Sequence, residues 1–455
     1  METAKILTIL VLAPSVMFCQ EQHGKASRTS TTLNPISTDS ESFLTVRETI
    51  DSLPAPIVTG NSVEVCLNSR YSQHTLSGTA SFQQLSNVLY YTGKAPIIGV
   101  YRNIYVSSQT ATYLYDPNNH TLIWYSDEAA DQGAFVISYD RELAFDAGVS
   151  YMPALLASVS LWESTESAVS SCPKGVKVYF GVQEVRGLTS ELAALSSIPE
   201  GEPGWLPDPS TMGENNVEVV LANLKYVDSF VQRDLTMQQI SQILWAGYGC
   251  TPHTTSNGRA GLTVPSAYAD YYLTGTIYLA NENGVYRYHN RNPSTDLTTR
   301  DHRLEQINFE DVRGSLQAAL SGLPKAPCYI ILCLDSSDEG QLYAHLETGF
   351  VASNILIQAS AIGLGCHFMT ELTLSEQESI QTATGIPLSD IPQVVVSMGP
   401  ICVEFKEFAR FAEHWLQTNC SGLNNWCDGA DFEPDGDVDW LDLQVFVNKW
   451  LASCQ

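Results

Sequence analysis

The sequence predicts an α+β fold in which one domain occurs twice, as two α/β sandwich halves fused in one chain. Three observations lead to this prediction. Segments of the first half recur in the same order in the second, helical and strand-like periods follow one another within each copy, and 44% of the 455 residues are hydrophobic, enough for sizeable cores. The recurring pairs are 81–92 with 236–247, 103–109 with 276–282, 146–161 with 347–362, and 176–182 with 392–399.

Both copies open with the same helix-start signal. Ser81 with Gln84, and Thr236 with Gln239, have the spacing of capping boxes, in which each side chain bonds to the backbone amide of the other residue. Apolar residues follow at helical spacing in both segments. We therefore predict an amphipathic helix at the start of each copy.

Strands and further helices complete each copy. A long apolar helix is expected at 343–362, ended by Gly363 and Gly365. Ser375 with Glu378 predicts the start of a short helix that stops at Gly385. Strand-like runs lie at 104–106, 277–279, 285–288, 329–334 and 394–397. Helices and strands in this order predict helices packed on a sheet.

Changes in composition mark the boundaries between the parts of the chain. Residues 20–59 are expected to be a disordered tether, because their Ser/Thr-rich start shows no periodicity. The first half occupies 60–185, and 186–216 is a Pro- and Gly-rich linker or covering arm. The second half occupies 217–403, and a tail module fills 404–455.

Residues 1–19 have the pattern of a secretory signal peptide. Lys5 precedes an apolar run that is too short to span a bilayer. Lipidation of Cys19 is disfavoured, because Phe18 stands where lipoprotein signals carry a small residue. We therefore expect an exported protein, in the periplasm, at the cell surface or outside the cell, without a transmembrane segment.

The formal net charge of −27 at pH 7 argues against two classes of partner. Nucleic acids and anionic membrane surfaces are both negatively charged and would repel such a chain. We therefore expect the partners to be a small-molecule substrate and, for the tail, a protein.

The cysteines fall into two groups. Several occur in apolar or strand-like runs and are expected to be buried thiols: Cys250, Cys328, Cys333, Cys366 and Cys402. Cys420, Cys427 and Cys454 lie in the polar tail. In an exported protein at least two of these three are expected to form a disulfide, but the sequence leaves the connectivity open.

The second copy resembles the nitroreductase superfamily of flavoenzymes, and within it the SagB-type dehydrogenases. The resemblance rests on residues 240–289, with support from 346–365 and 392–400. It implies a dimer with FMN at the interface between subunits. An Arg-x-Ser motif of one subunit holds the phosphate, and a Pro-Ser-Ala turn of the other packs on the isoalloxazine ring.

This chain divides those two motifs between its copies, so the resemblance implies an intrachain pseudo-dimer with one FMN and no need for a second chain. The degenerate first copy keeps Arg-x-Ser, and the second keeps Pro-Ser-Ala. The implied FMN site consists of Arg70, Ser72, Pro265, Ser266 and Ala267, with Arg259 as a further candidate for the flavin edge or an acidic substrate. A phosphate suits a guanidinium and a hydroxyl, and a flavin ring suits an apolar slot with backbone donors.

Other interpretations of these residues stay open. Arg70 could be an ordinary surface arginine, and Ser266 could be a helix N-cap, whose amides can still face a flavin ring. Tyr268, Tyr271 and Tyr272 are expected to be packing residues. The sequence has no HExxH, G-x-S-x-G or Walker motif, so in an enzyme the flavin would carry the reaction.

The tail contains a second motif. Its residues 428–442 include seven acids and no basic residue, with oxygen ligands at positions 1, 3, 5, 9 and 12 of an EF-hand-type loop and glycine at position 6. The loop and the following helix resemble dockerin type I modules, with Glu433 as a departure from the usual Asp or Asn. The expected Ca²⁺ ligands are Asp431, Glu433, Asp435, Asp437, Asp439 and Asp442.

Two functions follow from these features. The first is an exported FMN-dependent oxidoreductase that transfers hydride between an organic substrate and flavin N5. The alternative is a non-catalytic nitroreductase-like scaffold that acts as a binding or surface-display protein through its dockerin-like tail. The loss of one motif from each copy is what keeps the alternative open.

Overall fold

The structure is a computed structural model. It describes residues 50, 53–70, 82–99, 102–107, 111–127, 135–140, 144–161, 165–172, 175–182, 204–255, 257–291, 300–401, 405–421 and 424–453. The predicted signal peptide with Cys19, the start of the tether, Ser72, Ser81, Cys402 and Cys454 lie outside these ranges.

The described chain forms two six-stranded sheets with the same strand order, β3-β2-β1-β4-β6-β5 and β11-β10-β9-β12-β14-β13. All the paired strands in both sheets run antiparallel. The first sheet consists of β1 Ile104–Ser107, β2 Thr112–Asp116, β3 Thr121–Ser126, β4 Phe135–Asp140, β5 Thr165–Cys172 and β6 Gly175–Val182. The second consists of β9 Ile277–Asn281, β10 Gly284–Arg291, β11 Arg300–Asn308, β12 Cys328–Asp335, β13 Leu364–Met369 and β14 Asp390–Pro400.

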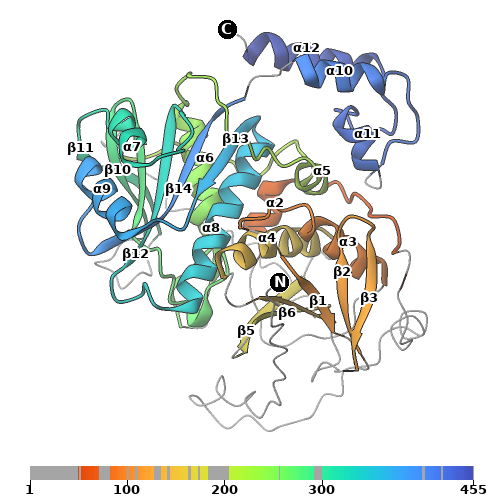
Figure 1. The fold of residues 1–455 in the computed structure, drawn as a ribbon, viewed down its shortest axis with the longest axis horizontal. Helices are drawn as coiled ribbons and strands as arrows, with labels where there is room; N and C mark the ends of the chain where they lie inside the picture. Colours follow the sequence, from red (N-terminus) through yellow and green to blue (C-terminus); the bar gives the residue numbers. More distant parts are fainter. Residues whose placement is uncertain are drawn as a thin grey trace, which may run out of the picture.

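Helices lie between the two sheets and on the outer face of the second sheet (Figure 1). Three helices of the first half have counterparts in the second: α2 Val63–Ser69 and α5 Val217–Ala222, α3 Phe82–Thr92 and α6 Met237–Tyr248, α4 Ala144–Leu161 and α8 Leu342–Ala361. The second half also contains α7 Arg313–Ala319, α9 Leu374–Thr384 and a small hairpin of β7 Cys250–Thr254 and β8 Ala260–Leu262. Each recurring pair of sequence segments thus forms the same element in both halves.

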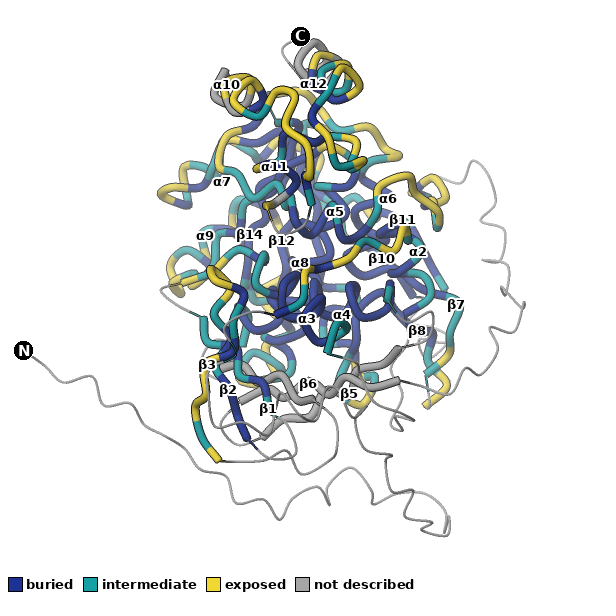
Figure 2. The backbone as a smooth tube through the Cα atoms, turned by 90° about the vertical axis from the view of Figure 1, so that its right-hand side faces the viewer, coloured by how far each residue is buried: buried dark blue, intermediate teal, exposed yellow. Residues whose placement is uncertain are grey.

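The long helices α4 and α8 cross at the centre of the molecule, where both are almost fully buried (Figure 2). They meet at two glycines. A Cβ atom on Gly148 would lie 2.3 Å from the carbonyl oxygen of Leu346, and one on Gly349 would lie 2.2 Å from that of Phe145. Only glycine therefore permits this approach, and the contact is reciprocal, as at an interface with two-fold symmetry.

A buried polar network also occurs twice. In the first half, His120 bonds through Nε2 to Ser86 and through Nδ1 to Tyr115, both at 2.8 Å. In the second half, His302 bonds in the same way to Ser241 at 2.8 Å and to Tyr288 at 2.9 Å. Each serine hydroxyl also donates to the carbonyl of a proline, Pro54 or Pro207, in the arm that precedes its half.

The two arms, residues 53–59 and 204–216, both pack on the halves that they precede. Residues 53–59, which we expected to belong to a disordered tether, are held through Ile57, whose amide and carbonyl both bond to the side-chain amide of Asn87. The arm at 204–216 is held in the same way by Gln242, which bonds to both backbone groups of Ser210. One side-chain amide satisfies the donor and the acceptor of an extended residue.

The predicted helix boundaries agree with the structure with one exception. Thr236 and Gln239 form a capping box, and α8 covers all but one residue of the predicted 343–362 helix. The predicted start of α9 at Ser375 is wrong, because the capping box is formed by Thr373 and Glu376. Both pairs have the required spacing, and the earlier pair starts the helix two residues sooner. Its end at Gly385, in the left-handed region, is confirmed.

Within the described residues, α4 alone is long and apolar enough to cross a membrane, and 83% of it is buried inside the protein. Five described cysteines are buried free thiols: Cys66, Cys250, Cys328, Cys333 and Cys366.

The tail consists of α10 Phe405–Glu413, α11 Asn425–Gly429 and α12 Trp440–Ser453, at one end of the molecule (Figure 1). A disulfide joins Cys420 to Cys427, which settles the pairing that the sequence left open.

Candidate functional site

Arg70 links the two halves of the protein. It stands at the C-terminus of α2 and its side chain is buried, so the interpretation as a surface arginine is wrong. Its guanidinium donates to the carbonyl oxygens of Leu262 at 2.7 Å, Thr263 at 3.2 Å and Val264 at 3.0 Å. These three residues directly precede Pro265. An arginine of the first half therefore lies against the Pro-Ser-Ala segment of the second, while Ser72 lies outside the described residues.

The Pro-Ser-Ala segment begins a strained turn. Tyr268, Ala269 and Tyr271 all have φ 55°, a backbone conformation that residues other than glycine seldom adopt. Ser266 occupies the N-cap position of a short 3₁₀ helix, but its hydroxyl makes no cap bond and accepts a bond from the amide of Tyr271 at 2.8 Å. Tyr271 is buried, as expected of a packing residue, whereas Tyr268 is exposed, which corrects that expectation.

Arg259 holds this turn from its other end. Its Nη1 donates to the carbonyl of Ala269 at 2.7 Å and forms an ion pair with Asp270 at 3.7 Å. The side chain is partly exposed, so the ion pair itself adds little to stability. The structure thus gives Arg259 a role in shaping the turn, in addition to its predicted place near a flavin edge or an acidic substrate.

Two further arginines surround the β7–β8 hairpin. Arg291 is buried, lies with its guanidinium carbon 4.0 Å from the centre of the Tyr271 ring, and donates to the carbonyl of Ala260. Arg300 donates to the carbonyls of Thr251 at 2.8 Å and Pro252 at 3.0 Å. No motif in the sequence marks either residue, because they lie on adjacent strands that meet only in the folded sheet.

These arginines make the hairpin electropositive in a strongly acidic protein. Burial, followed by the charges of Arg70, Arg300 and Arg291, lowers the pKa of His253 to about 3. The Nε and Nη1 atoms of Arg291 are buried and have no hydrogen-bond partner in the described part of the chain. A buried guanidinium with unused donors is costly, unless an anion supplies the missing acceptors.

Comparison with known proteins assigns the chain to a family. The sequence pattern described as Nitroreductase family matches residues 229–400. A nitroreductase-like protein of Methanocaldococcus jannaschii is 32% identical over 174 residues, which cover 35% of this chain and 79% of that protein. The chain belongs to the nitroreductase family.

The mixed α/β fold is shared with a solved nitroreductase-type structure. A nitroreductase-type structure from Anabaena variabilis, 14% identical, covers 77% of this chain and 94% of that chain with a TM-score of 0.51. A nitroreductase-type structure from Desulfovibrio desulfuricans, solved in complex with FMN and also 14% identical, covers 41% of this chain and 86% of that chain with a TM-score of 0.28. The first of these likenesses extends well beyond the 229–400 region.

A buried carboxylate lies next to the turn of this nitroreductase-family protein. Tyr248 donates to Oε1 of Glu347 at 2.5 Å, while Oε2 is buried without a partner among the described residues. Burial raises the pKa of Glu347 to about 7, and hydrogen bonds from Ser266 and Tyr248 lower it in part. The counterpart in the first half, Asp146, is held by Arg102 through two bonds of 2.7 and 2.6 Å. The second half has Gly275 in place of that arginine.

We expect Glu347→Gln to stabilise the protein more at pH 8 than at pH 5. Because the folded state raises the pKa from 4.5 to about 7, the stability contributed by the protonated acid is full below pH 4.5 and is lost as the pH rises through 7. The shift corresponds to about 3 kcal/mol. Urea unfolding of the unsubstituted protein and of Glu347→Gln at pH 5 and pH 8 measures this difference in the free energy of unfolding. Glu378→Gln, at an exposed position, is the control. A Glu347→Gln effect independent of pH would contradict the assignment.

The predicted Ca²⁺ ligands in the tail loop differ in burial and in their hydrogen bonds. Asp431 and Asp442 are buried, Glu433, Asp435 and Asp437 are exposed, and Asp439 is half-buried. Asp442 accepts bonds from three backbone amides, those of residues 432, 433 and 439. Among the described residues, no three or more Asp, Glu, His or Cys side chains are grouped so as to hold a metal ion. The six predicted ligands therefore do not converge in this arrangement.

Proposed function

We propose that this chain is an FMN-dependent oxidoreductase with a single flavin site between its two halves. The observation that carries the proposal is the contact of the Arg70 guanidinium with residues 262–264, next to the Pro-Ser-Ala turn. Membership of the nitroreductase family supports the cofactor and the class of reaction. The site then requires both halves, because each half supplies one of the two motifs.

In this proposal the halves are the products of a duplication and form an intrachain pseudo-dimer. Support comes from the identical strand orders, from the reciprocal contact of Gly148 and Gly349, and from the repeated serine–histidine–tyrosine networks. Two unrelated domains would not share buried networks of the same side chains at the same positions in the chain order. A homodimer would carry two equivalent sites, whereas the fused chain has kept the groups of one.

The residues present suit FMN. Arg70 and Arg291 would hold the phosphate, and the unpartnered Nε and Nη1 of Arg291 are donors for its oxygens. Backbone groups of Pro265, Ser266 and Ala267 would contact the ring. When bound, FMN supplies hydride acceptance and donation at N5. Glu347 holds a proton up to about pH 7, and Tyr248, which donates to its Oε1, fixes the carboxyl group beside the turn.

We further propose that the substrate is oxidised, as in SagB-type dehydrogenases, and that oxygen takes up the electrons. This direction follows from the proposed export of the chain, since nicotinamide cofactors are scarce outside the cytoplasm. Export itself rests on the signal-like pattern of residues 1–19. The substrate would be a small organic molecule.

Chemical reduction of the FMN-loaded protein tests the oxidoreductase. Under anaerobic conditions dithionite is expected to bleach the flavin bands, and admission of oxygen is expected to restore them over repeated cycles without loss of FMN. A protein that releases its FMN on reduction, or that never takes up FMN, would support the non-catalytic scaffold instead.

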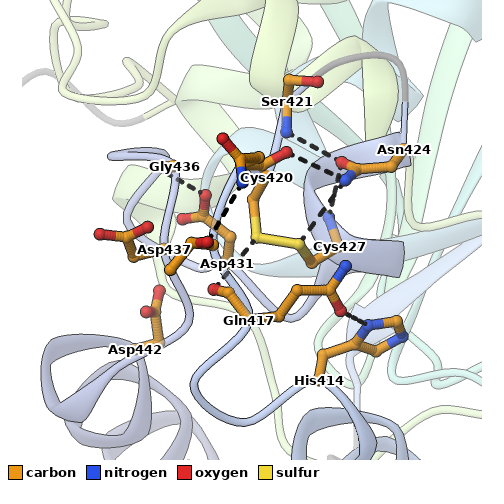
Figure 3. The surroundings of a disulfide bond; sticks show 12 residues. His414, Gln417, Cys420, Ser421, Asn424, Cys427, Asp431, Gly436, Asp437 and Asp442 are labelled. Atoms are coloured by element: carbon orange, nitrogen blue, oxygen red, sulfur yellow. Dashed lines mark hydrogen bonds between the residues drawn. A yellow bond between two sulfur atoms is a disulfide. The ribbon is translucent and has the colours of Figure 1, made fainter.

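We also propose that the tail binds one Ca²⁺ ion and docks a protein partner. In support, Asp431 is buried, its Oδ2 accepts a bond from the amide of Gly436 at 3.1 Å, and its Oδ1 has no partner among the described residues. It lies beside the Cys420–Cys427 disulfide, which holds the start of the loop (Figure 3). Burial, together with the charges of Asp442 and Asp435, raises the pKa of Asp431 to about 7. A divalent cation would supply the missing partner.

Isothermal titration with CaCl₂ is expected to show one site that Asp431→Asn abolishes. Exposed Asp428→Asn, just outside the loop, is the matched control and is expected to leave binding unchanged. Because Ca²⁺ competes with the proton on Asp431, affinity is expected to fall as the pH drops below 7. Absence of binding to the full chain would refute this part of the proposal.

A further inference from the structure

A cavity lies between the halves, and none of its lining residues is an arginine. Its volume is about 490 Å³, large enough for a drug-sized molecule. The first half contributes residues around the start of α4, and the second half contributes the start of α8 and the segment that follows β13. Its lining includes Ile98, Phe145 and Asp146 from the first half and Leu342, His345 and Glu371 from the second.

This cavity is the internal counterpart of the turn with Glu347. Asp146 holds the position in α4 that Glu347 holds in α8, and Ile98 holds the position of Ser266 in the Pro-Ser-Ala segment. In the first half, Asp146 accepts a bond from the amide of Ile98 at 2.8 Å. In the second half, Ser266 is one of the groups that lower the pKa of Glu347. The cavity thus occupies the place of a second flavin site.

The chemistry of the cavity differs from that of the arginine-lined site. The residues that line it include no lysine or arginine. Both oxygens of Asp146 are occupied by Arg102, whose charge is thereby neutralised inside the protein. Glu371 is exposed at the cavity with φ 55°, a strained conformation of the kind found at binding sites. An anionic group would therefore meet a carboxylate and no cation, which disfavours a phosphate.

The remaining lining suits an uncharged ring. Phe145, Ile98 and Leu342 provide apolar surface. His345 donates from Nε2 to the carbonyl of Glu339 at 2.5 Å, so Nδ1 is an acceptor in the neutral ring. Gln393 donates from Nε2 to the carbonyl of Ile391 at 3.0 Å, and no bond to its Oε1 is found among the described residues. Apolar walls with a few oriented polar groups are typical of sites for neutral heterocycles.

We propose that this cavity binds an uncharged, phosphate-free heteroaromatic molecule and rejects FMN. In this view the chain has kept one cofactor site and has converted the other, so that the same interface holds two different ligands. The inference rests on the proposed function only in that the Arg70 site is expected to be filled by FMN beforehand.

Riboflavin and FMN are the probes, because they differ only in the phosphate. The FMN-loaded full chain is dialysed to equilibrium against each, and bound FMN and riboflavin are separated by chromatography. We expect saturable binding of one riboflavin in addition to the resident FMN, with FMN at least about tenfold weaker at the second site. Ile98→Trp, which fills the cavity, is expected to abolish the additional riboflavin and to leave the FMN content unchanged. Ile97→Trp, at an exposed neighbour outside the lining, is the matched control.

The outcomes separate this inference from the proposed function. No additional riboflavin, riboflavin binding that Ile98→Trp leaves intact, or second-site FMN as tight as riboflavin would each overturn the inference while one FMN per chain still supports the enzyme. Riboflavin binding that Ile98→Trp abolishes, in a chain that takes up no FMN, would support the cavity and refute the oxidoreductase.

Discussion

Replacement of Arg70 by alanine is expected to weaken FMN binding by about 3 kcal/mol, roughly a hundredfold in Kd. The guanidinium would make charge-assisted contacts with the phosphate, and its loss would also leave the carbonyls of residues 262–264 without their donor. Fluorescence titration of FMN measures the affinity, and circular dichroism checks that the variant is folded.

Two variants make this result specific. Arg70→Lys keeps the charge but not the planar fork, so it is expected to recover only part of the affinity. Lys225→Ala removes the cation at the corresponding position of the second half and is expected to leave FMN binding unchanged. Equal losses in Arg70→Ala and Lys225→Ala, or none in either, would contradict the assignment of the phosphate to the first half's arginine.

Replacement of Gly349 by alanine is expected to destabilise the protein by about 3 kcal/mol, despite the better helix propensity of alanine. The added Cβ would lie 2.2 Å from the carbonyl oxygen of Phe145 and 2.9 Å from the Cα atom of Gly148. Both are backbone atoms, so α4 and α8 must move apart. Because the same interface carries the flavin site, FMN affinity is expected to fall with stability.

Gly314→Ala is the matched control for that substitution. It lies near the start of α7, and a Cβ there would meet nothing within 4 Å. Its effect on the free energy of urea unfolding is expected to stay within about 1 kcal/mol. If Gly349→Ala is as harmless as Gly314→Ala, the two long helices do not cross at their glycines, and the proposed pseudo-dimer is wrong.

Local sequence signals predicted much of the second half's fold. The capping box at Thr236, the apolar run that became α8 and the strand-like runs all depend on residues close together in the chain. Most first-half strands were not predicted, because β2, β3 and β5 carry little apolar alternation. The start of α9 was misplaced, since two overlapping residue pairs offered the same capping signal.

The candidate site could be predicted only where a motif carries it. Arg70 and the Pro-Ser-Ala segment were predicted from a family resemblance, and the structure brings them together. Arg291, Arg300 and Glu347 were missed, because their roles depend on burial and on neighbours that are distant in the sequence. Comparison of the two copies could have found Glu347, since its counterpart Asp146 has an arginine partner that the second copy replaces with Gly275.

The absorbance spectrum of the full-length protein, purified and then supplied with FMN, tests the central claim most directly. If Arg70 of the first half and the Pro-Ser-Ala turn of the second form one site, the protein is predicted to be yellow and to retain one FMN per chain after unbound FMN is washed away. A colourless protein, or one that retains two equivalent FMN molecules, would contradict a single cofactor site shared between the two halves.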